Sequence, residues 1–172
     1  MYQLIYDELK NEIIQIDPNG KSTTIANDYP SEPVFSPNEQ KAIYISPLEW
    51  ECPGSLYLYN LENGYIEEII SPTAEVMSDI PKYAIWLDDN NIGVIIGFSM
   101  GTVAVGGNVF IYNIENKSLQ QVTNYPSEIQ VTQIIKHEDY LELQGIQYTD
   151  SILNNFKEFH EKLSLSKIAP LE

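Results

Sequence analysis

The pentapeptide GFSMG at residues 97–101 has the residue types of a nucleophile elbow. It follows an apolar run, and in α/β-hydrolases such a Gly-x-Ser-x-Gly turn exposes a serine nucleophile. The chain order agrees, because Ser99 precedes Asp139 or Asp150 as orienting acid and His160 as base. The elbow must continue into a helix that supports the oxyanion hole, yet "TVAVGGNVFIYN" predicts a glycine-rich loop and a strand. We therefore expect no catalysis at Ser99, and a hydrolase is kept as an alternative.

Paired carboxylates are a second source of chemistry, because two such groups across a cleft can serve as acid and base in glycoside hydrolysis. The pairs are Glu49 and Glu51, Glu67 and Glu68, Asp88 and Asp89, and Glu138 and Asp139. Most of them fall in predicted turns, where acidic residues are favoured anyway. We therefore interpret them as turn residues, with a carboxylate-based hydrolase as the alternative.

Metal and cofactor binding find little support in the sequence. His137 and His160 are the only histidines, and neither has a partner at metal-ligand spacing. The single cysteine, Cys52, excludes an intrachain disulfide and a cysteine-based zinc cluster. We expect no metal and no cofactor.

The charge balance limits the classes of partner. The 172 residues include 25 acidic and nine basic residues, all of the latter Lys, for a net charge of −16. Nucleic acid and anionic membrane surfaces need a cationic face, so both are disfavoured. We expect a protein, peptide or carbohydrate partner. The sequence shows no export signal and no apolar run of about 20 residues, so we expect no membrane insertion.

The tetrapeptide YPSE occurs twice and marks an internal repeat. Pro30, Pro81 and Pro126 stand 51 and 45 residues apart, each two residues after an Asp or Asn. Such residues favour a turn that leads into a new strand. In addition, residues 54–70 match residues 107–122 at an offset of 53, as a predicted hairpin. The repeated unit therefore contains four short strands, a to d from the inside outward.

The expected fold is all-β, a small β-propeller-like array of about three four-stranded blades with one C-terminal helix. Residues 29–71 and 80–124 are the two complete blades. A c–d hairpin at 1–28 and an a–b hairpin at 125–148 are complementary halves of a third, and pairing the termini would close the ring. A distorted ring, an open arc, or a homodimer that completes six blades are alternatives for so few blades.

The segment "PVFSPNEQKAIYIS…GSLYLYNLENGYIEEII" resembles the propeller repeat of the TolB and tricorn protease type. That repeat runs as an aromatic residue, Ser-Pro-Asp-Gly, an apolar strand, a Leu-Tyr-x-Tyr-Asp strand, a Gly turn and a closing strand. The match is good from Pro33 to Ile70 and weaker from Pro81 to Val122, and the repeat's Asp-Gly is Asn38-Glu39 here. The chain is also similar to small bacterial domains of unknown function. The resemblance implies a WD40-like propeller fold and carries no activity with it.

The segment "DSILNNFKEFHEKL" interrupts the β pattern. Ile152, Phe156, Phe159 and Leu163 recur at helical spacing, with Asp150 placed as N-cap. This predicts an amphipathic helix over 150–163, followed by an edge strand over 164–169.

The functional expectation is a non-catalytic binding module of unknown ligand. In a propeller the b-to-c loops and d-to-a turns emerge on one face, and both complete b-to-c loops here are long. The binding residues predicted on this face are Trp50, Glu49, Glu51, Phe98, Met100, Tyr29 and Tyr125. Exposed aromatic side chains offer large contact area at low entropic cost. The alternatives are a lid over the core, a hydrolase, and a structural domain that dimerises.

Overall fold

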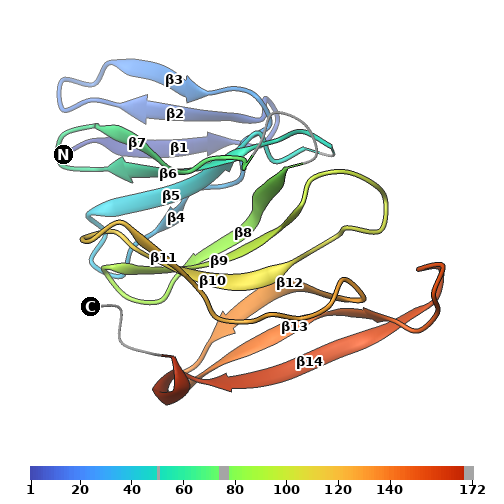
Figure 1. The fold of residues 1–172 in the computed structure, drawn as a ribbon. Coiled ribbons are helices and arrows are strands. Elements are labelled where there is room, and N and C mark those ends of the chain that lie inside the picture. Colours follow the sequence, from blue (N-terminus) through green and yellow to red (C-terminus); the bar gives the residue numbers. More distant parts are fainter. Residues whose placement is uncertain (50, 74–77, 169–172) are drawn as a thin grey trace.

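The computed structural model describes residues 1–49, 51–73 and 78–168. Its strands form four antiparallel sheets, and the described residues contain one short 3-10 helix, η1 (Leu165–Lys167), and no α-helix. The sheets follow one another from the N-terminus at the top of Figure 1 to the last strand at the bottom. The described part of the chain has no helix with the length and apolarity needed to cross a membrane.

Each sheet is a meander in which every strand pairs with the next strand of the chain. The N-terminal sheet contains β1 (Gln3–Asp7), β2 (Glu12–Ile16) and β3 (Ser22–Ala26). The second sheet contains β4 (Val34–Phe35), β5 (Lys41–Ser46), β6 (Ser55–Asn60) and β7 (Ile66–Ile70). The third contains β8 (Asp79–Trp86), β9 (Asn91–Phe98), β10 (Asn108–Asn113) and β11 (Ser118–Gln121). The C-terminal sheet contains β12 (Ile129–Lys136), β13 (Tyr140–Tyr148) and β14 (Phe156–Ser164).

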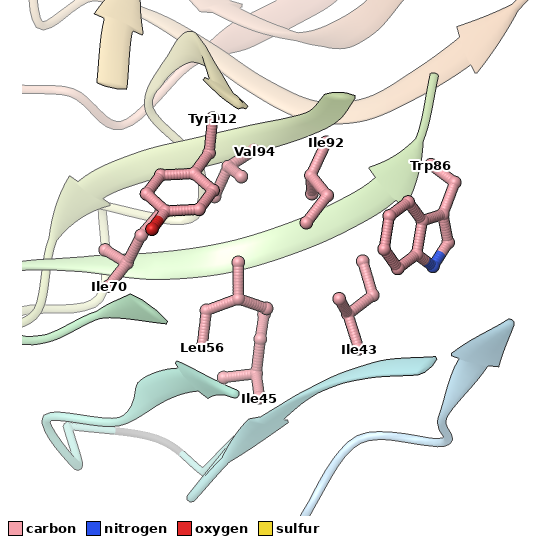
Figure 2. Packing of buried hydrophobic residues seen from close by; sticks show 8 residues of the cluster. All are labelled: Ile43, Ile45, Leu56, Ile70, Trp86, Ile92, Val94 and Tyr112. Carbon is pink, nitrogen blue, oxygen red and sulfur yellow. The ribbon is translucent and has the colours of Figure 1, made fainter. Parts of the chain in front are cut away.

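The two middle sheets are covered on both faces. Ile43 and Ile45 of β5 pack with residues of the third sheet, whereas Ala42 and Tyr44 pack with the N-terminal sheet. Side chains alternate between the faces of a strand, so a strand buried on both sides is apolar throughout. Figure 2 shows Ile43 and its neighbours pointing across the interface toward the third sheet. A further cluster joins the third sheet to the C-terminal sheet.

The all-β expectation is confirmed, but the expectation of three blades is wrong. Gln3–Asp7 form an additional strand, so the predicted hairpin at the N-terminus becomes a sheet of its own instead of half a blade. Phe156–Ser164 do the same for the hairpin of β12 and β13. Each end of the chain therefore completes its sheet locally, and the N-terminal and C-terminal sheets lie at opposite ends of the array (Figure 1). Among the described strands, none of the N-terminal sheet pairs with one of the C-terminal sheet, so the expected pairing of the termini is not found there.

The predicted helix over 150–163 is also wrong. Phe159 and Leu163, four residues apart, lie on one side of a helix but also on one face of a strand. In the structure both pack from β14 into the core shared with the third sheet. Asp150 accepts hydrogen bonds from the backbone of Ile152 and Asn154, as an N-cap would, but it does so in a hairpin turn and not at the start of a helix. In the described part of the expected edge strand over 164–169, Ser164 ends β14 and Leu165–Lys167 form η1.

Candidate functional site

Two long loops meet on one side of the second and third sheets. One loop joins β5 to β6 through residues 47–54, and the other joins β9 to β10 through residues 99–107. The Glu51 carboxylate accepts a hydrogen bond from the Gly101 backbone at 3.2 Å, which links the loops. The Tyr29 carbonyl accepts one from the Leu48 backbone at 2.8 Å, so the turn before β4 lies beside them.

A cavity of about 250 Å³ lies between these loops and the strand β8. Its lining consists of Pro47, Leu48, Glu49, Glu51, Cys52, Ile80, Pro81, Lys82, Ser99, Gly101, Ala104 and Val105. Most of these residues are apolar, and the charged ones are two carboxylates from a loop and one ammonium from a strand. A largely apolar concave site with a few polar groups is the usual form of a ligand pocket. We call it the loop cavity.

Lys82 reaches the loop cavity because β8 contains a β-bulge. The pairing of β8 with β9 shifts register between Pro81 and Tyr83, which makes Lys82 the extra residue. A bulge bends its strand and changes the direction of a side chain. The Lys82 ammonium donates a hydrogen bond to the carbonyl of Ala104 in the opposite loop.

Burial sets the protonation of Lys82. Desolvation lowers the pKa of its ammonium from 10.5 to about 8, and the charge of Asp79 opposes this shift. The ion pairs found among residues 1–49, 51–73 and 78–168 do not include Lys82. Among the described residues, the carboxylate that opposes this shift is that of Asp79, three residues earlier on the same strand.

A second cavity, of about 220 Å³, adjoins the first between the second and third sheets. Leu48 and Lys82 line both cavities, so the two cavities are neighbours. The side chains that line the second cavity include the apolar groups of Val34, Ile43, Ile45, Leu56, Tyr83 and Ala84, and its lining also contains Tyr44, Ser31 and the exposed Glu32. We call it the inter-sheet cavity. Lys82 thus lies between a mixed and a mainly apolar space.

The residues predicted for the binding face are divided between two places. Glu49 and Glu51 line the loop cavity, and Tyr29, at 51% exposure, lies beside Leu48. Trp50, predicted at the centre of the face, lies outside the described residues.

Phe98 and Tyr125 instead line a cavity of about 360 Å³ between the third and C-terminal sheets. The Tyr125 ring packs edge to face on Phe159, and its burial together with the Glu161 carboxylate raises the pKa of its hydroxyl. Met100 is half-buried in its loop and belongs to the lining of neither cavity.

The structure separates the residues of the triad that the hydrolase alternative would require. Ser99 is 9% exposed and lines the loop cavity, and its backbone donates to the Ser78 carbonyl at 2.9 Å. His160 lies on β14 in the C-terminal sheet, near Glu158, and Asp150 lies in the turn before that strand. Neither is among the residues that line the cavity of Ser99. The titratable residues that share this cavity with Ser99 are Lys82, Glu49, Glu51 and Cys52.

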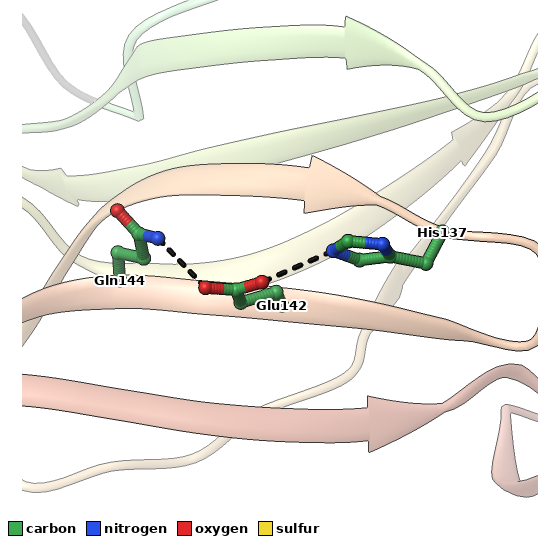
Figure 3. Close-up of polar contacts among 3 residues, drawn as sticks. All are labelled: His137, Glu142 and Gln144. Carbon is green, nitrogen blue, oxygen red and sulfur yellow. Dashed lines mark hydrogen bonds and ion pairs between the residues drawn. The ribbon is translucent and has the colours of Figure 1, made fainter.

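The other histidine belongs to the C-terminal sheet. His137 pairs with Glu142 at 3.0 Å and stacks on Tyr140, and Glu142 also accepts a hydrogen bond from Gln144 (Figure 3). The bonds from Gln144 and His137 lower the pKa of the Glu142 carboxyl. Over the described ranges, no three His, Cys, Asp or Glu residues are grouped so that they could hold a metal ion.

Sequence reasoning missed Lys82 and Cys52 as cavity residues. The signal for Lys82 was a charged residue inside "DIPKYAIW", an otherwise apolar strand next to a proline. A lysine there must either reach solvent or face a cavity. Cys52 gave no such signal, because its position depends on the course of the loop.

Comparison with known proteins supports the fold. A conserved lipoprotein from Clostridium novyi NT superposes with a TM-score of 0.71 at 27% identity, over 78% of this chain and 86% of that chain. Oligopeptidase B from Leishmania major superposes with a TM-score of 0.56 at 10% identity, over 96% of this chain and 23% of that chain, which shows the fold alone. TolB from Acinetobacter baumannii gives a TM-score of only 0.34 at 15% identity, over 88% of this chain and 46% of that chain, too low to support the expected relation.

No protein of curated function matches the chain in sequence. A family model, by contrast, matches residues 72–167, which is more than half of the 172 residues and includes β8 to β14. The match includes Lys82, Ser99 and the 99–107 loop, while the 47–54 loop lies outside it. The chain belongs to the family described as domain of unknown function (DUF4652).

Proposed function

We propose that this protein is a non-catalytic binding module that takes up a peptide segment of another protein at the loop cavity. The observation that carries the proposal is a concave, mostly apolar site between two long loops, with charged groups of both signs in its lining. Peptides present apolar side chains and charged groups together, so they match such a lining. An interaction module built on sheets with binding loops at one end is a common use of β-folds.

The net charge of −16 favours a partner that is neutral or cationic, because long-range repulsion slows the approach of an anionic one. Glu49 and Glu51 in the lining favour the same choice locally. The proposal therefore excludes nucleic acid and favours peptides with basic residues.

The test uses a synthetic peptide library presented with free C-termini in one set and free N-termini in another. Leu48 is 47% exposed and lines both cavities, whereas Leu119 is 44% exposed on β11. We expect Leu48→Gln to lose the selected peptides and the matched control Leu119→Gln to retain them. If both variants bind every selected peptide like the parent protein, the loop cavity is not the site.

A serine hydrolase is the second candidate, because Ser99 and Lys82 line one cavity and the neutral amine of a lysine can act as a base. This version predicts covalent labelling of Ser99 by a fluorophosphonate probe, with loss of labelling in Ser99→Ala. An unlabelled folded protein would eliminate this candidate.

A further inference from the structure

We propose that Lys82 and the two cavities beside it bind the C-terminal carboxylate and the apolar last side chain of a peptide whose preceding residues are basic. This inference rests on the proposed function and assigns its ligand class. It depends on three features: the ammonium of Lys82, which forms no ion pair within the described residues, the mainly apolar space next to it, and the carboxylates on the loop side.

The ammonium of Lys82 has hydrogen-bonding capacity to spare. A lysine carries three N–H donors, and the carbonyl of Ala104 accepts one of them. In the described part of the chain Lys82 takes part in no ion pair, although it is half-buried. Burial of a cation without a carboxylate is unfavourable. A ligand carboxylate would therefore supply both the missing acceptors and the missing charge.

The position of Lys82 determines where that carboxylate lies. The β-bulge places the side chain at the boundary between the loop cavity and the inter-sheet cavity. A carboxylate bound there would have an apolar space on one side and the loops on the other. A C-terminal residue has this geometry, because its side chain and its preceding peptide leave the same Cα atom in different directions.

The inter-sheet cavity fits the last side chain. Its volume is about 220 Å³, and its lining includes Val34, Ile43, Ile45 and Leu56. This space is large enough for an aliphatic side chain, whose burial in apolar surroundings is favourable. A charged or amide side chain would bury polar atoms against these apolar groups, which is unfavourable. The cavity therefore selects an apolar last residue such as Leu.

The loop side selects cations. Glu49 and Glu51 line the loop cavity, and the chain as a whole carries a net charge of −16. A ligand that is only an anion would be repelled by these carboxylates, whereas basic residues before the last one would be attracted. For this reason a basic peptide with a free C-terminus fits better than a free fatty acid, which shares the carboxylate and the apolar group.

The experiment compares acetyl-Ser-Lys-Lys-Leu as the free acid and as the C-terminal amide by titration calorimetry, with octanoate as a third probe. The proteins are the parent, Lys82→Met, and the control Lys136→Met, which removes an exposed lysine at the end of β12. We expect the acid to bind about tenfold or more tightly than the amide to the parent and to the control, and equally in Lys82→Met. Affinity for the acid should also fall as the pH rises above 8, where Lys82 loses its charge.

The outcomes separate this inference from the function on which it rests. Equal binding of acid and amide to the parent, or a preference for the acid that persists in Lys82→Met, overturns the inference. If such equal binding is lost in Leu48→Gln, peptide capture at the loop cavity still stands. If octanoate binds in a way that depends on Lys82 and neither peptide binds, the site recognises a carboxylate, but the inference that a peptide supplies it is overturned. Absence of binding by all three probes overturns both proposals.

Discussion

Two interfaces between neighbouring sheets can be compared: the first lies between the second and third sheets, and the second lies between the third and C-terminal sheets. Both are built from equivalent parts, but only at the second is the loop joined to the next sheet by backbone hydrogen bonds. At the second of these interfaces Gly107 and Val131 exchange two backbone hydrogen bonds, of 3.0 and 3.1 Å, which join the loop to the inner strand β12. At the first, Gly54 directly precedes β6 as Gly107 precedes β10, and Pro81 directly precedes the bulge of β8 as Val131 precedes that of β12. No such bridge joins Gly54 and Pro81 among the described residues. Proline has no N–H to donate. A proline at this position can therefore form at most one of the two bonds of such a bridge, which favours the open arrangement beside the loop cavity.

The β-bulges of β8 and β12, the first strands of the third and C-terminal sheets, also differ between the two interfaces. The bulge of β8 contributes Lys82, which is withdrawn into the cavities, and the bulge of β12 contributes Thr132, which is exposed. The same backbone device therefore places a side chain in a site at one interface and in solvent at the other. This comparison indicates that the cavity, rather than the bulge, gives Lys82 its unusual environment.

The largest effect is expected from Gly106→Ala, which tests the closed interface. A Cβ atom at this position would lie 2.0 Å from the carbonyl oxygen of Val131, so backbone must move. We expect a loss of about 3 kcal/mol or more in the free energy of unfolding, measured by urea denaturation. Gly101→Ala is the control, since its Cβ meets open space and only its φ of +86° is unfavourable, at a cost of about 1 kcal/mol. Equal losses in the two variants would contradict the close contact.

Lys82→Met is the next test and examines the open interface. The folded pKa of about 8 lies below the ordinary 10.5, so the charged lysine destabilises the fold below pH 8. That cost disappears as the pH rises from 8 to 10.5, because the folded protein gives up its proton first. We expect the variant to be more stable than the parent by about 2 kcal/mol at pH 7, with a difference that decreases at pH 10. A difference that does not depend on pH would show that Lys82 keeps its charge through this range.

Strands could be predicted from the sequence more reliably than the pairing between them. The alternating and continuous apolar runs predicted strands because local periodicity depends on residues close in the chain. The C-terminal strand was misassigned because Phe159 and Leu163 satisfy both periods, and only their contacts with the third sheet decide between them. Completion of the end sheets was missed because strand pairing is a tertiary property.

The candidate site was predictable in part for a similar reason. Loop length placed Glu49 and Glu51 on one side of the molecule, and the structure finds both in the lining of the loop cavity. Lys82 lies on a strand rather than on a loop, and its register depends on a bulge that no local pattern of the sequence indicates. Residues that reach a site through irregular backbone are the ones that sequence reasoning is least able to find.

Trp86→Phe should have a smaller effect and tests what joins the second and third sheets in place of a bridge. The indole N–H of Trp86 donates to the Val34 carbonyl at 2.8 Å, and its ring packs in the cluster shown in Figure 2. Removal of one hydrogen bond and part of a buried ring should lower the free energy of unfolding by about 1 to 2 kcal/mol. Urea denaturation at neutral pH measures this loss. A variant as stable as the parent would mean that the hydrogen bond of Trp86 contributes nothing measurable to this interface.

The smallest effect is expected from Thr132→Lys, which places a lysine on the bulge of the closed interface. Thr132 is exposed, and its hydroxyl makes only a long hydrogen bond of 3.4 Å to the Gln144 carbonyl. A lysine there would stay in water and keep its ordinary pKa, so the free energy of unfolding should change by no more than about 0.5 kcal/mol. The difference from the parent, measured by urea denaturation, should be the same at pH 7 and pH 10. If the variant instead gained stability at the higher pH, a lysine on either bulge would be desolvated, and the two interfaces would differ less than their backbone contacts indicate.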